Sequence, residues 1–284
     1  MKIQRKPEWL KKKLDFNQSR PTANILNAIG VHTVCREAKC PNISECFKEN
    51  HATFLILGKY CTRRCLFCNV EKTKPLPLDK NEPQKVAQAV LELRLKHAVV
   101  TSVTRDDIPD GGASIFAETV REIKKVSNKT STELLIPDFK ADKAALKTVV
   151  ESKPDIIGHN LETIARLYHL RPQADYQRSL KVLQFIKDID ENIHTKSALL
   201  LGLGEKENEV VDAMKGLKKH NCDFLCLGQY LRPSLKHTEI AEYINPRQFG
   251  HYKTIALNLG FKHVESAPYA RSSWQAEEYL KLTC

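Results

Sequence analysis

The sequence is poor in the features that mark membrane proteins and repetitive structures. None of its apolar runs approaches the length that crosses a bilayer, and the basic start, MKIQRKPEWLKKKLDF, lacks the apolar stretch of a secretory signal. We find no internal repeat and no low-complexity linker. Aromatic residues make up only 7% of the chain, and no basic stripe is interleaved with aromatics that could stack on bases. We therefore expect a cytoplasmic globular protein without a membrane partner.

Charge and cysteine content narrow the class of protein. The formal charge of +11 favours an acidic partner, either nucleic acid or an acidic protein surface, and a solvated basic face is the alternative. Apart from Lys11, Lys12 and Lys13 the basic residues are dispersed, so nucleic acid is not expected as a partner. Nine cysteines in a cytoplasmic chain are typical of metal ligands or reactive thiols rather than of disulfides.

Short apolar runs alternate with helical patterns after about residue 52. The runs expected to be strands are 53–57, 98–103, 133–136, 155–158, 198–201 and 224–227, with a seventh near 261–264. Between them apolar residues recur at helical steps, as at Val86, Val90 and Leu93. This alternation predicts parallel βαβ units and an α/β fold, a partial (β/α)6 TIM-like barrel. We expect residues 51–265 to form the barrel, with residues 1–50 and 266–284 as N- and C-terminal extensions packed on it.

Two cysteine triplets lie close together near the start of this pattern. Cys61-x3-Cys65-x2-Cys68 follows the first predicted strand, where a parallel barrel carries its chemistry, and Cys35-x4-Cys40-x5-Cys46 lies just upstream. Three thiolates on a tight loop can hold three corners of a cubane iron–sulfur cluster and leave the fourth iron open. The alternatives are structural thiols or zinc, but zinc sites favour paired C-x2-C units, which neither triplet supplies twice.

The second triplet in chain order, Cys61, Cys65 and Cys68, resembles the motif of the radical S-adenosylmethionine superfamily. In that superfamily the open iron binds the amino and carboxylate groups of S-adenosylmethionine, whose reductive cleavage yields a 5′-deoxyadenosyl radical. The first triplet is similar to the auxiliary-cluster motif of lipoyl synthases. The resemblance to that family continues through HTVCREAKCPNISEC, TSVTRDDIPDGGA, HNLETIARLY, RPQADYQRSL, GLGE, GQYLRPS and RSSW.

The resemblance implies two 4Fe–4S clusters with different tasks. Cys61, Cys65 and Cys68 would hold the radical-generating cluster, and Cys35, Cys40 and Cys46 an auxiliary cluster that is consumed as the sulfur donor. Family members complete the auxiliary site with a serine, for which Ser273 is our first choice and Ser272 the second. A pair of serines capping the final helix is the competing interpretation. Trp274 stands where the family has tyrosine.

Contacts to S-adenosylmethionine are also implied by the resemblance. The residues expected to make them are Thr101, Asn160, Glu162, Arg178, Gly202 and Glu205. The acids of TRDDIPDGG could instead cap a helix or form turns, while Gly111 and Gly112 would permit close approach of the backbone. Ala198 stands where the pattern of adenine contacts begins with glycine. Alanine is tolerated there unless the backbone needs a positive φ.

The implied activity is insertion of two sulfur atoms at C6 and C8 of a protein-bound octanoyl chain, with two S-adenosylmethionine molecules per product. The implied partners are octanoylated lipoyl carrier domains, namely dehydrogenase-complex acyltransferase subunits and the glycine cleavage H protein. An electron donor such as ferredoxin or flavodoxin and a cluster-repair carrier are expected too. The alternatives are a radical methylthiotransferase that modifies RNA and a non-enzymatic iron–sulfur or zinc scaffold. Cys222 and Cys226 are expected in the core, and no chemistry is assigned to them or to Cys284.

Overall fold

The computed structural model describes residues 5–12, 17–274 and 276–281, so Cys284 lies outside the described residues. One eight-stranded sheet forms its centre, and the strands follow one another in chain order from β1 to β8. They are β1 (His32–Thr33), β2 (Thr53–Ile56), β3 (His97–Ser102), β4 (Ser131–Leu135), β5 (Ile156–Gly158), β6 (His194–Leu201), β7 (Phe224–Gln229) and β8 (His263–Ser266). All neighbouring pairs from β2 to β8 are parallel, whereas β1 pairs with β2 antiparallel.

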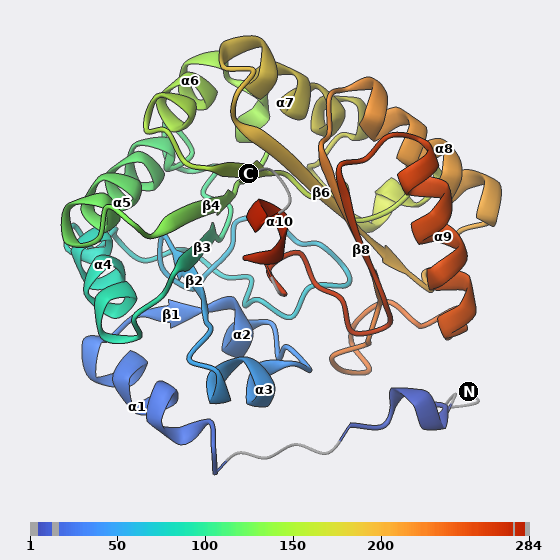
Figure 1. Ribbon diagram of the computed structural model, residues 1–284, viewed down its shortest axis with the longest axis horizontal. Coiled ribbons are helices and arrows are strands. Elements are labelled where there is room, and N and C mark those ends of the chain that lie inside the picture. Colours follow the sequence, from blue (N-terminus) through green and yellow to red (C-terminus); the bar gives the residue numbers. More distant parts are fainter. Residues whose placement is uncertain (1–4, 13–16, 275, 282–284) are drawn as a thin grey trace.

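A helix follows each strand from β2 to β7 and covers the outside of the sheet (Figure 1). These helices are α4 (Glu82–Glu92), α5 (Ala113–Val126), α6 (Lys143–Glu151), α7 (Tyr176–Ile189), α8 (Glu207–Lys219) and α9 (Pro246–Asn258), with 3-10 turns η2 (Phe139–Ala141) and η3 (Ala165–Leu170) before α6 and α7. The predicted partial (β/α)6 barrel is confirmed, and β8 is the seventh strand expected near residues 261–264. The short antiparallel strand β1 was not predicted, because two residues carry no readable pattern.

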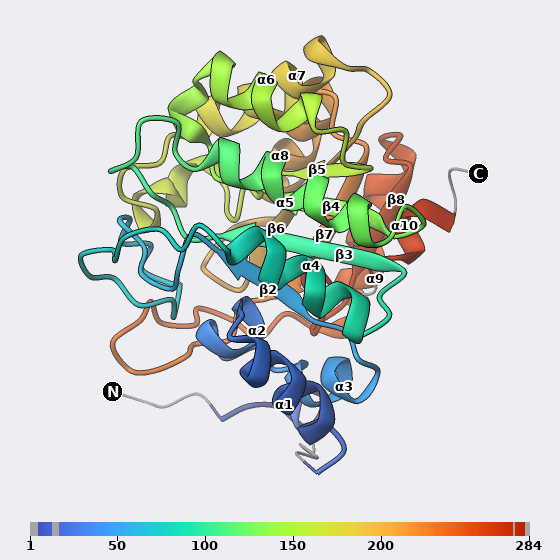
Figure 2. The same ribbon diagram turned by 90° about the vertical axis from the view of Figure 1, so that its left-hand side faces the viewer.

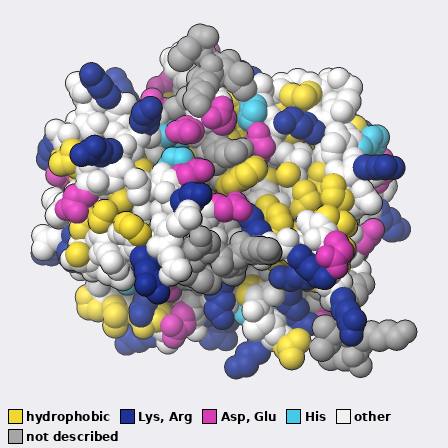
Figure 3. Space-filling model, turned by 60° about the horizontal axis from the view of Figure 1, so that its bottom comes forward, with side chains coloured by type: hydrophobic (Ala, Val, Ile, Leu, Met, Phe, Trp, Pro, Cys, Tyr) yellow, Lys and Arg dark blue, Asp and Glu magenta, His cyan; other side chains and the backbone are white. Residues whose placement is uncertain are grey.

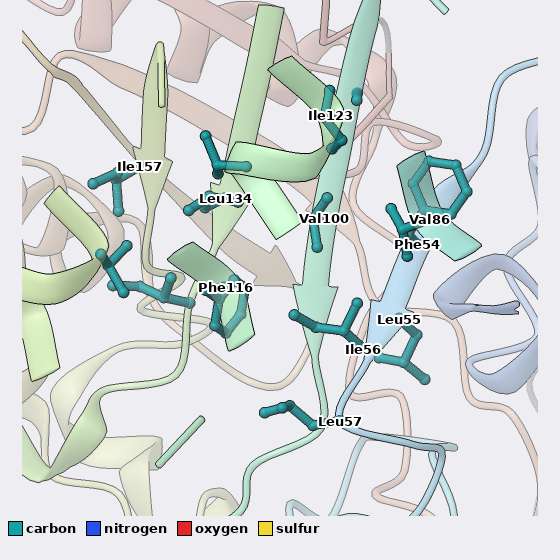
Figure 4. Packing of buried hydrophobic residues seen from close by; sticks show 14 of the residues in the cluster. Phe54, Leu55, Ile56, Leu57, Val86, Val100, Phe116, Ile123, Leu134 and Ile157 are labelled. Atoms are coloured by element: carbon teal, nitrogen blue, oxygen red, sulfur yellow. The ribbon is translucent and has the colours of Figure 1, made fainter. Parts of the chain in front are cut away.

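Apolar side chains on the outer face of the sheet form the main core under the helices. Figure 4 shows Phe54, Val100 and Leu134 on neighbouring strands packed beneath Val86 of α4 and Phe116 of α5, and all five are at most 1% exposed. Strand side chains alternate between the two faces. The residues between these, such as Thr101 on β3, therefore face the barrel interior.

The N-terminal segment packs against the first strands of the barrel. It contains η1 (Glu8–Leu10), α1 (Arg20–Ile29), α2 (Val34–Glu37) and α3 (Ile43–Lys48). Leu26, Cys35 and Phe47 are buried in the same core cluster as Phe54 and Val100. The exact boundaries at residues 50 and 265 stay a prediction.

The C-terminal helix α10 (Glu278–Lys281) lies within the ring of strands in Figure 1. In Figure 2 it is at the opposite end of the barrel from the loops that follow β2 and β7. Lys and Arg side chains are scattered over the face in Figure 3 rather than gathered in one patch. None of the helices in the described ranges is both long and apolar enough to span a bilayer.

Candidate active site

The loop after β2 carries the second cysteine triplet at the carboxyl end of the sheet. Its cysteines are Cys61, Cys65 and Cys68. The backbone N–H of Thr104, which follows β3, lies 3.3 Å from the Sγ of Cys61, as a donor to sulfur would. The N–H of Leu66 donates to the carbonyl of Leu170 at 2.8 Å. Neighbouring strand-end loops therefore fix the backbone that carries the thiols.

The loop of residues 231–243, which follows β7, crosses this cysteine loop. The N–H of Thr238 donates to the carbonyl of Leu66 at 3.0 Å, and the Nε2 of His237 lies 3.1 Å from the carbonyl oxygen of Cys68. The hydroxyl of Tyr230 donates to the carbonyl of Thr238 at 2.9 Å and steadies the crossing loop. These hydrogen bonds of the chain hold the backbone of the cysteine loop in place.

The thiols of this loop are partly shielded from water and act electrostatically on one another. Burial, with the nearby Cys65 and Cys61, raises the pKa of Cys68 to about 12. Burial also raises the pKa of Cys65, while the guanidinium of Arg171 opposes that rise. Crowded, buried thiols can ionise together only against positive charge, such as that of cluster iron.

Asn160 and Glu162 lie directly after β5, at the same end of the sheet. The Nδ2 of Asn160 donates to the Oε1 of Glu162 at 3.1 Å. Glu162 adopts a φ of 67° and exchanges backbone hydrogen bonds with β6, donating to Ala198 and accepting from Leu200. Burial raises the pKa of Glu162, and Arg171 and Asn160 oppose the rise. These hydrogen bonds hold the polar pair close enough to the cysteine loop for Glu162 to act electrostatically on Cys65.

The other residues expected at S-adenosylmethionine already bind groups of the chain. The hydroxyl of Thr101 donates to the carbonyl of Leu135 at 2.9 Å. The Nε of Arg178 donates to Asp138 at 2.9 Å. The carboxylate of Glu205 accepts the N–H of Gly202 at 2.5 Å. Of the six expected residues, two pairs are in contact, Asn160 with Glu162 and Gly202 with Glu205.

The segment TRDDIPDGG after β3 contains an acid that caps a helix, as the alternative interpretation of its acids predicted. Asp110 accepts the N–H groups of Gly112 and Ser114, both at 2.9 Å, and so caps the start of α5. Asp106 instead binds Arg63 of the cysteine loop at 2.8 Å. A Cβ on Gly112 would lie 2.3 Å from the side chain of Leu57, so close packing explains this glycine. The expectation that it serves approach to a ligand has no support in its surroundings.

The first cysteine triplet lines a separate cavity of about 260 Å³. Thr53, His97 and Val99 place this cavity toward the amino ends of β2 and β3. Burial, with neighbouring Cys35 and Cys40, raises the pKa of Cys46 to about 12. The three thiols are therefore near one another although each comes from a different turn of the N-terminal segment.

The RSSW segment reaches this cavity from the opposite end of the chain. Ser273 and Trp274 line it together with Cys35, Cys40 and Cys46. Ser272 does not line it, and its hydroxyl instead donates to the Oδ1 of Asn160 at 3.1 Å. The helix-cap interpretation of the serines is wrong, because α10 begins only at Glu278. The geometry favours Ser273 over Ser272 as a fourth donor.

Comparison with known proteins decides the family. A sequence model described as "Radical SAM superfamily" matches residues 55–217. A protein named lipoyl synthase from Geotalea uraniireducens is 53% identical over 98% of this chain and 99% of its own length. Lipoyl synthases from Caldanaerobacter subterraneus and Citrifermentans bemidjiense are 52% and 54% identical over 98% of this chain and 98% and 95% of theirs. The chain belongs to the lipoyl synthase family.

Solved structures agree with this membership at the level of the fold. Methylornithine synthase (PylB) superposes with a TM-score of 0.56 at 14% identity, covering 91% of this chain and 80% of that one. HydG, a maturase of the [FeFe]-hydrogenase, gives 0.59 at 12% identity over 94% and 74% of the two chains. At such low identity these likenesses concern the barrel alone.

Membership of the lipoyl synthase family implies 4Fe–4S clusters and S-adenosylmethionine as cofactors, and the donor sets fit clusters. No three His, Cys, Asp or Glu side chains within the described ranges are arranged to hold a single metal ion. A zinc ion would need its thiolates about 2.3 Å from one centre. A cubane presents a separate iron to each thiolate, so its ligands stand farther apart. Two groups of three thiols, of which Cys35 is buried and the other five are partly buried, fit such clusters and leave one iron of each for another donor.

Two departures from the family pattern are accommodated by the packing. Ala198 lies in the extended strand β6, and its φ is not among the positive ones, so the backbone there has no need of glycine. Trp274 packs with Ala198, Cys226 and Ala270 inside the barrel. The indole replaces a tyrosine ring against an apolar surface. Cys226 and Cys222 are buried in the core as expected.

Two arginines of the site were missed by sequence reasoning. Arg171 donates to the carbonyl of Asn160 at 3.2 Å and acts electrostatically on Cys65 and Glu162. Arg271 acts on both Glu162 and Cys40, and so lies between the two groups of candidate residues. Both belong to the motifs RPQAD and RSSW, but only the folded chain shows which charges they meet.

Proposed function

We propose that this chain is a lipoyl synthase, which inserts two sulfur atoms at C6 and C8 of an octanoyl chain carried on a protein lysine. The observation that carries the proposal is the presence of two thiol triplets on one barrel, with Ser273 beside the first. Relatives that carry the name match almost the whole chain. Two S-adenosylmethionine molecules are consumed per product.

We assign the cluster ligands by the positions of the thiols. Cys61, Cys65 and Cys68 would hold the radical-generating cluster, and three cysteine ligands would leave a position for S-adenosylmethionine. Cys35, Cys40, Cys46 and Ser273 would hold the auxiliary cluster. A hydroxyl oxygen is a harder and weaker ligand for cluster iron than a thiolate. The serine therefore suits a cluster that must give up an iron when its sulfur is used.

Contacts to S-adenosylmethionine are assigned to the carboxyl end of the barrel. The residues proposed are Thr101, Asn160, Glu162, Arg178, Gly202 and Glu205. Asn160 and Glu162 have the strongest support, because they lie together beside Cys65. Arg178 has less, since Asp138 already engages its Nε and its Nη2 donates to the carbonyl of Gln173 at 2.8 Å.

The chain's own residues orient the reactants and exclude water. When bound, the cluster and S-adenosylmethionine supply a carbon-centred radical that can remove hydrogen from an unactivated C–H bond. The 231–243 loop crosses the cysteine loop, and Arg171 places a partly buried positive charge beside Cys65. Residues 1–50 and 266–284 act as extensions that bring the auxiliary cluster to the barrel formed by residues 51–265.

The proposed partners are lipoyl carrier proteins bearing the octanoyl chain, in particular dehydrogenase-complex acyltransferase subunits and the glycine cleavage H protein. Ferredoxin or flavodoxin would supply electrons, and a cluster-repair carrier would rebuild the auxiliary cluster. We place the reaction in the cytoplasm. No observation favours an RNA substrate, since the basic side chains of the face in Figure 3 are dispersed.

The test is an anaerobic reaction of the reconstituted protein with an octanoyl-lysine peptide, S-adenosylmethionine and a reductant. Mass spectrometry of the peptide should show two sulfur atoms gained. Loss of hydrogen without gain of sulfur, or sulfur added to RNA instead, would refute the assignment. Omitting the reductant is the matched control, and it should leave the peptide unchanged.

A further inference from the structure

A hydrogen bond joins the RSSW segment to the loop after β5. The hydroxyl of Ser272 donates to the side-chain oxygen of Asn160 at 3.1 Å, although the two residues are 112 positions apart. Both side chains are partly buried. Through this bond the RSSW turn contacts a residue that is proposed to bind S-adenosylmethionine.

The amide of Asn160 is held on both of its polar atoms. Its Nδ2 donates to Glu162 at 3.1 Å, and its Oδ1 accepts from Ser272. The backbone of the same residue is fixed as well, since its carbonyl accepts from the guanidinium of Arg171 at 3.2 Å. Removing Ser272 would leave only one of the two side-chain bonds that set the direction of this amide.

The other end of the link is a tight turn. The N–H of Trp274 donates to the carbonyl of Arg271 at 2.9 Å, which closes the turn around Ser272 and Ser273. Ser272 faces Asn160, whereas Ser273 faces the cavity of the first cysteine triplet. Because both serines lie inside one closed turn, a displacement of Ser272 also displaces Ser273.

We propose that Ser272 is a positioning residue that couples the two sites: it holds Ser273 over the auxiliary cavity and orients the amide of Asn160 toward the nucleoside cofactor. The inference rests on the proposed function of these sites. Coupling between two sites is reciprocal. A ligand that engages Asn160 must therefore shift the Ser273 turn, and loss of the Ser272 hydroxyl must weaken binding of that ligand.

The chain offers a spectroscopic reporter for this turn. It contains only two tryptophans, Trp9 and Trp274, and the second follows Ser273 directly. In a Trp9→Phe background, acrylamide quenching of the remaining fluorescence reports how well the turn is held. The variants to compare, in the cluster-loaded protein, are Ser272→Ala and Ser272→Thr, with the affinity for S-adenosylmethionine measured by equilibrium dialysis.

We expect Ser272→Ala to weaken S-adenosylmethionine binding roughly 2- to 10-fold, the effect of one hydrogen bond, and to increase quenching of Trp274. Ser272→Thr keeps a hydroxyl and should restore both values. Asn160→Ala should increase quenching as much as Ser272→Ala does, and the double variant should increase it no further.

Wild-type affinity and quenching in Ser272→Ala would overturn the coupling, as would additive effects in the double variant. Neither the affinity for S-adenosylmethionine nor the quenching of Trp274 depends on sulfur transfer. Failure of the octanoyl-peptide reaction in the wild-type protein would count against the proposed function alone, and these readouts would still decide whether Ser272 links the two loops.

Discussion

Lys196 of β6 and Tyr279 of α10 meet inside the barrel, where the Nζ of Lys196 lies 3.6 Å from the centroid of the tyrosine ring. The same Nζ donates to Glu133 at 3.0 Å, and none of the three residues is exposed. Phe224 and His263, the first residues of β7 and β8, surround the ring at 5.2 Å and 4.7 Å between centroids. Tyr279 therefore closes the amino end of the barrel and anchors the segment that carries Ser273.

Tyr279→Ala should lower the free energy of unfolding by about 3–5 kcal/mol, because it removes a fully buried ring and uncovers the ammonium of Lys196. Tyr279→Phe keeps the ring and should cost less than about 1.5 kcal/mol. Chemical denaturation followed by circular dichroism measures both. A loss below about 1 kcal/mol in the alanine variant would show that α10 is not an anchor.

Gly112→Ala should also destabilise the protein, by more than about 1 kcal/mol. The φ of Gly112 is 91°, and an added Cβ would lie 2.3 Å from a terminal carbon of Leu57. Gly250→Ala is the matched control, since it lies within α9 with nothing inside 4 Å of its Cβ position. That change should be neutral or stabilising by up to about 1 kcal/mol. Melting temperatures that move equally in both variants would contradict the packing argument.

His159 makes stability depend on pH. Burial, aided by the charge of Arg171, lowers its pKa from 6.5 to about 4. As the pH falls from about 6.5, the unfolded chain takes up the proton before the folded chain does. Stability is therefore present in full above pH 6.5 and declines down to about pH 4, by roughly 3 kcal/mol.

His159→Gln should remove this part of the acid dependence. The measurement is urea denaturation of the cluster-free proteins from pH 7 to pH 4, which avoids acid loss of iron. The difference in unfolding free energy between the wild type and the variant should change steadily over that range. A constant difference would mean that His159 is not buried in its neutral form.

The barrel could be predicted because its signals are local. Each buried strand is a short apolar run, and each helix repeats apolar residues at its own period, as Phe116, Val120 and Ile123 do in α5. Because the second cysteine triplet and Asn160 each follow a predicted strand, both could be predicted to lie at the carboxyl ends of strands. The strand β1 escaped prediction because two residues show no periodicity.

The contacts between distant parts of the chain could not be predicted. The RSSW motif identified two serines, but only folding shows that Ser273 faces the first triplet while Ser272 turns to Asn160. Arg178 was expected to bind the carboxylate of a ligand, but in the folded chain its guanidinium donates to Asp138 instead. Charge partners of this kind depend on side chains brought together by tertiary structure, which spacing along the sequence does not encode.

Binding of an octanoylated carrier domain should weaken as salt rises. The chain carries a formal charge of +11, so an acidic carrier is attracted over distances that salt screens beyond about 10 Å at 0.1 M. Titration of the carrier between 50 mM and 300 mM salt should give a steadily rising dissociation constant, because the screening length shortens as salt is added. Sucrose at matched osmolality is the control and should have little effect. An affinity indifferent to salt would argue against electrostatic attraction.

The most direct measurement compares 5′-deoxyadenosine with thiolated peptide in the variant in which Cys35, Cys40 and Cys46 are all changed to Ala. The loop of Cys61, Cys65 and Cys68 is untouched in this variant and is held by its own contacts. The account predicts that one cluster remains, that 5′-deoxyadenosine still forms, and that no sulfur enters the peptide. Sulfur insertion by this variant, or loss of 5′-deoxyadenosine while a cluster remains, would contradict the division of labour between the two triplets.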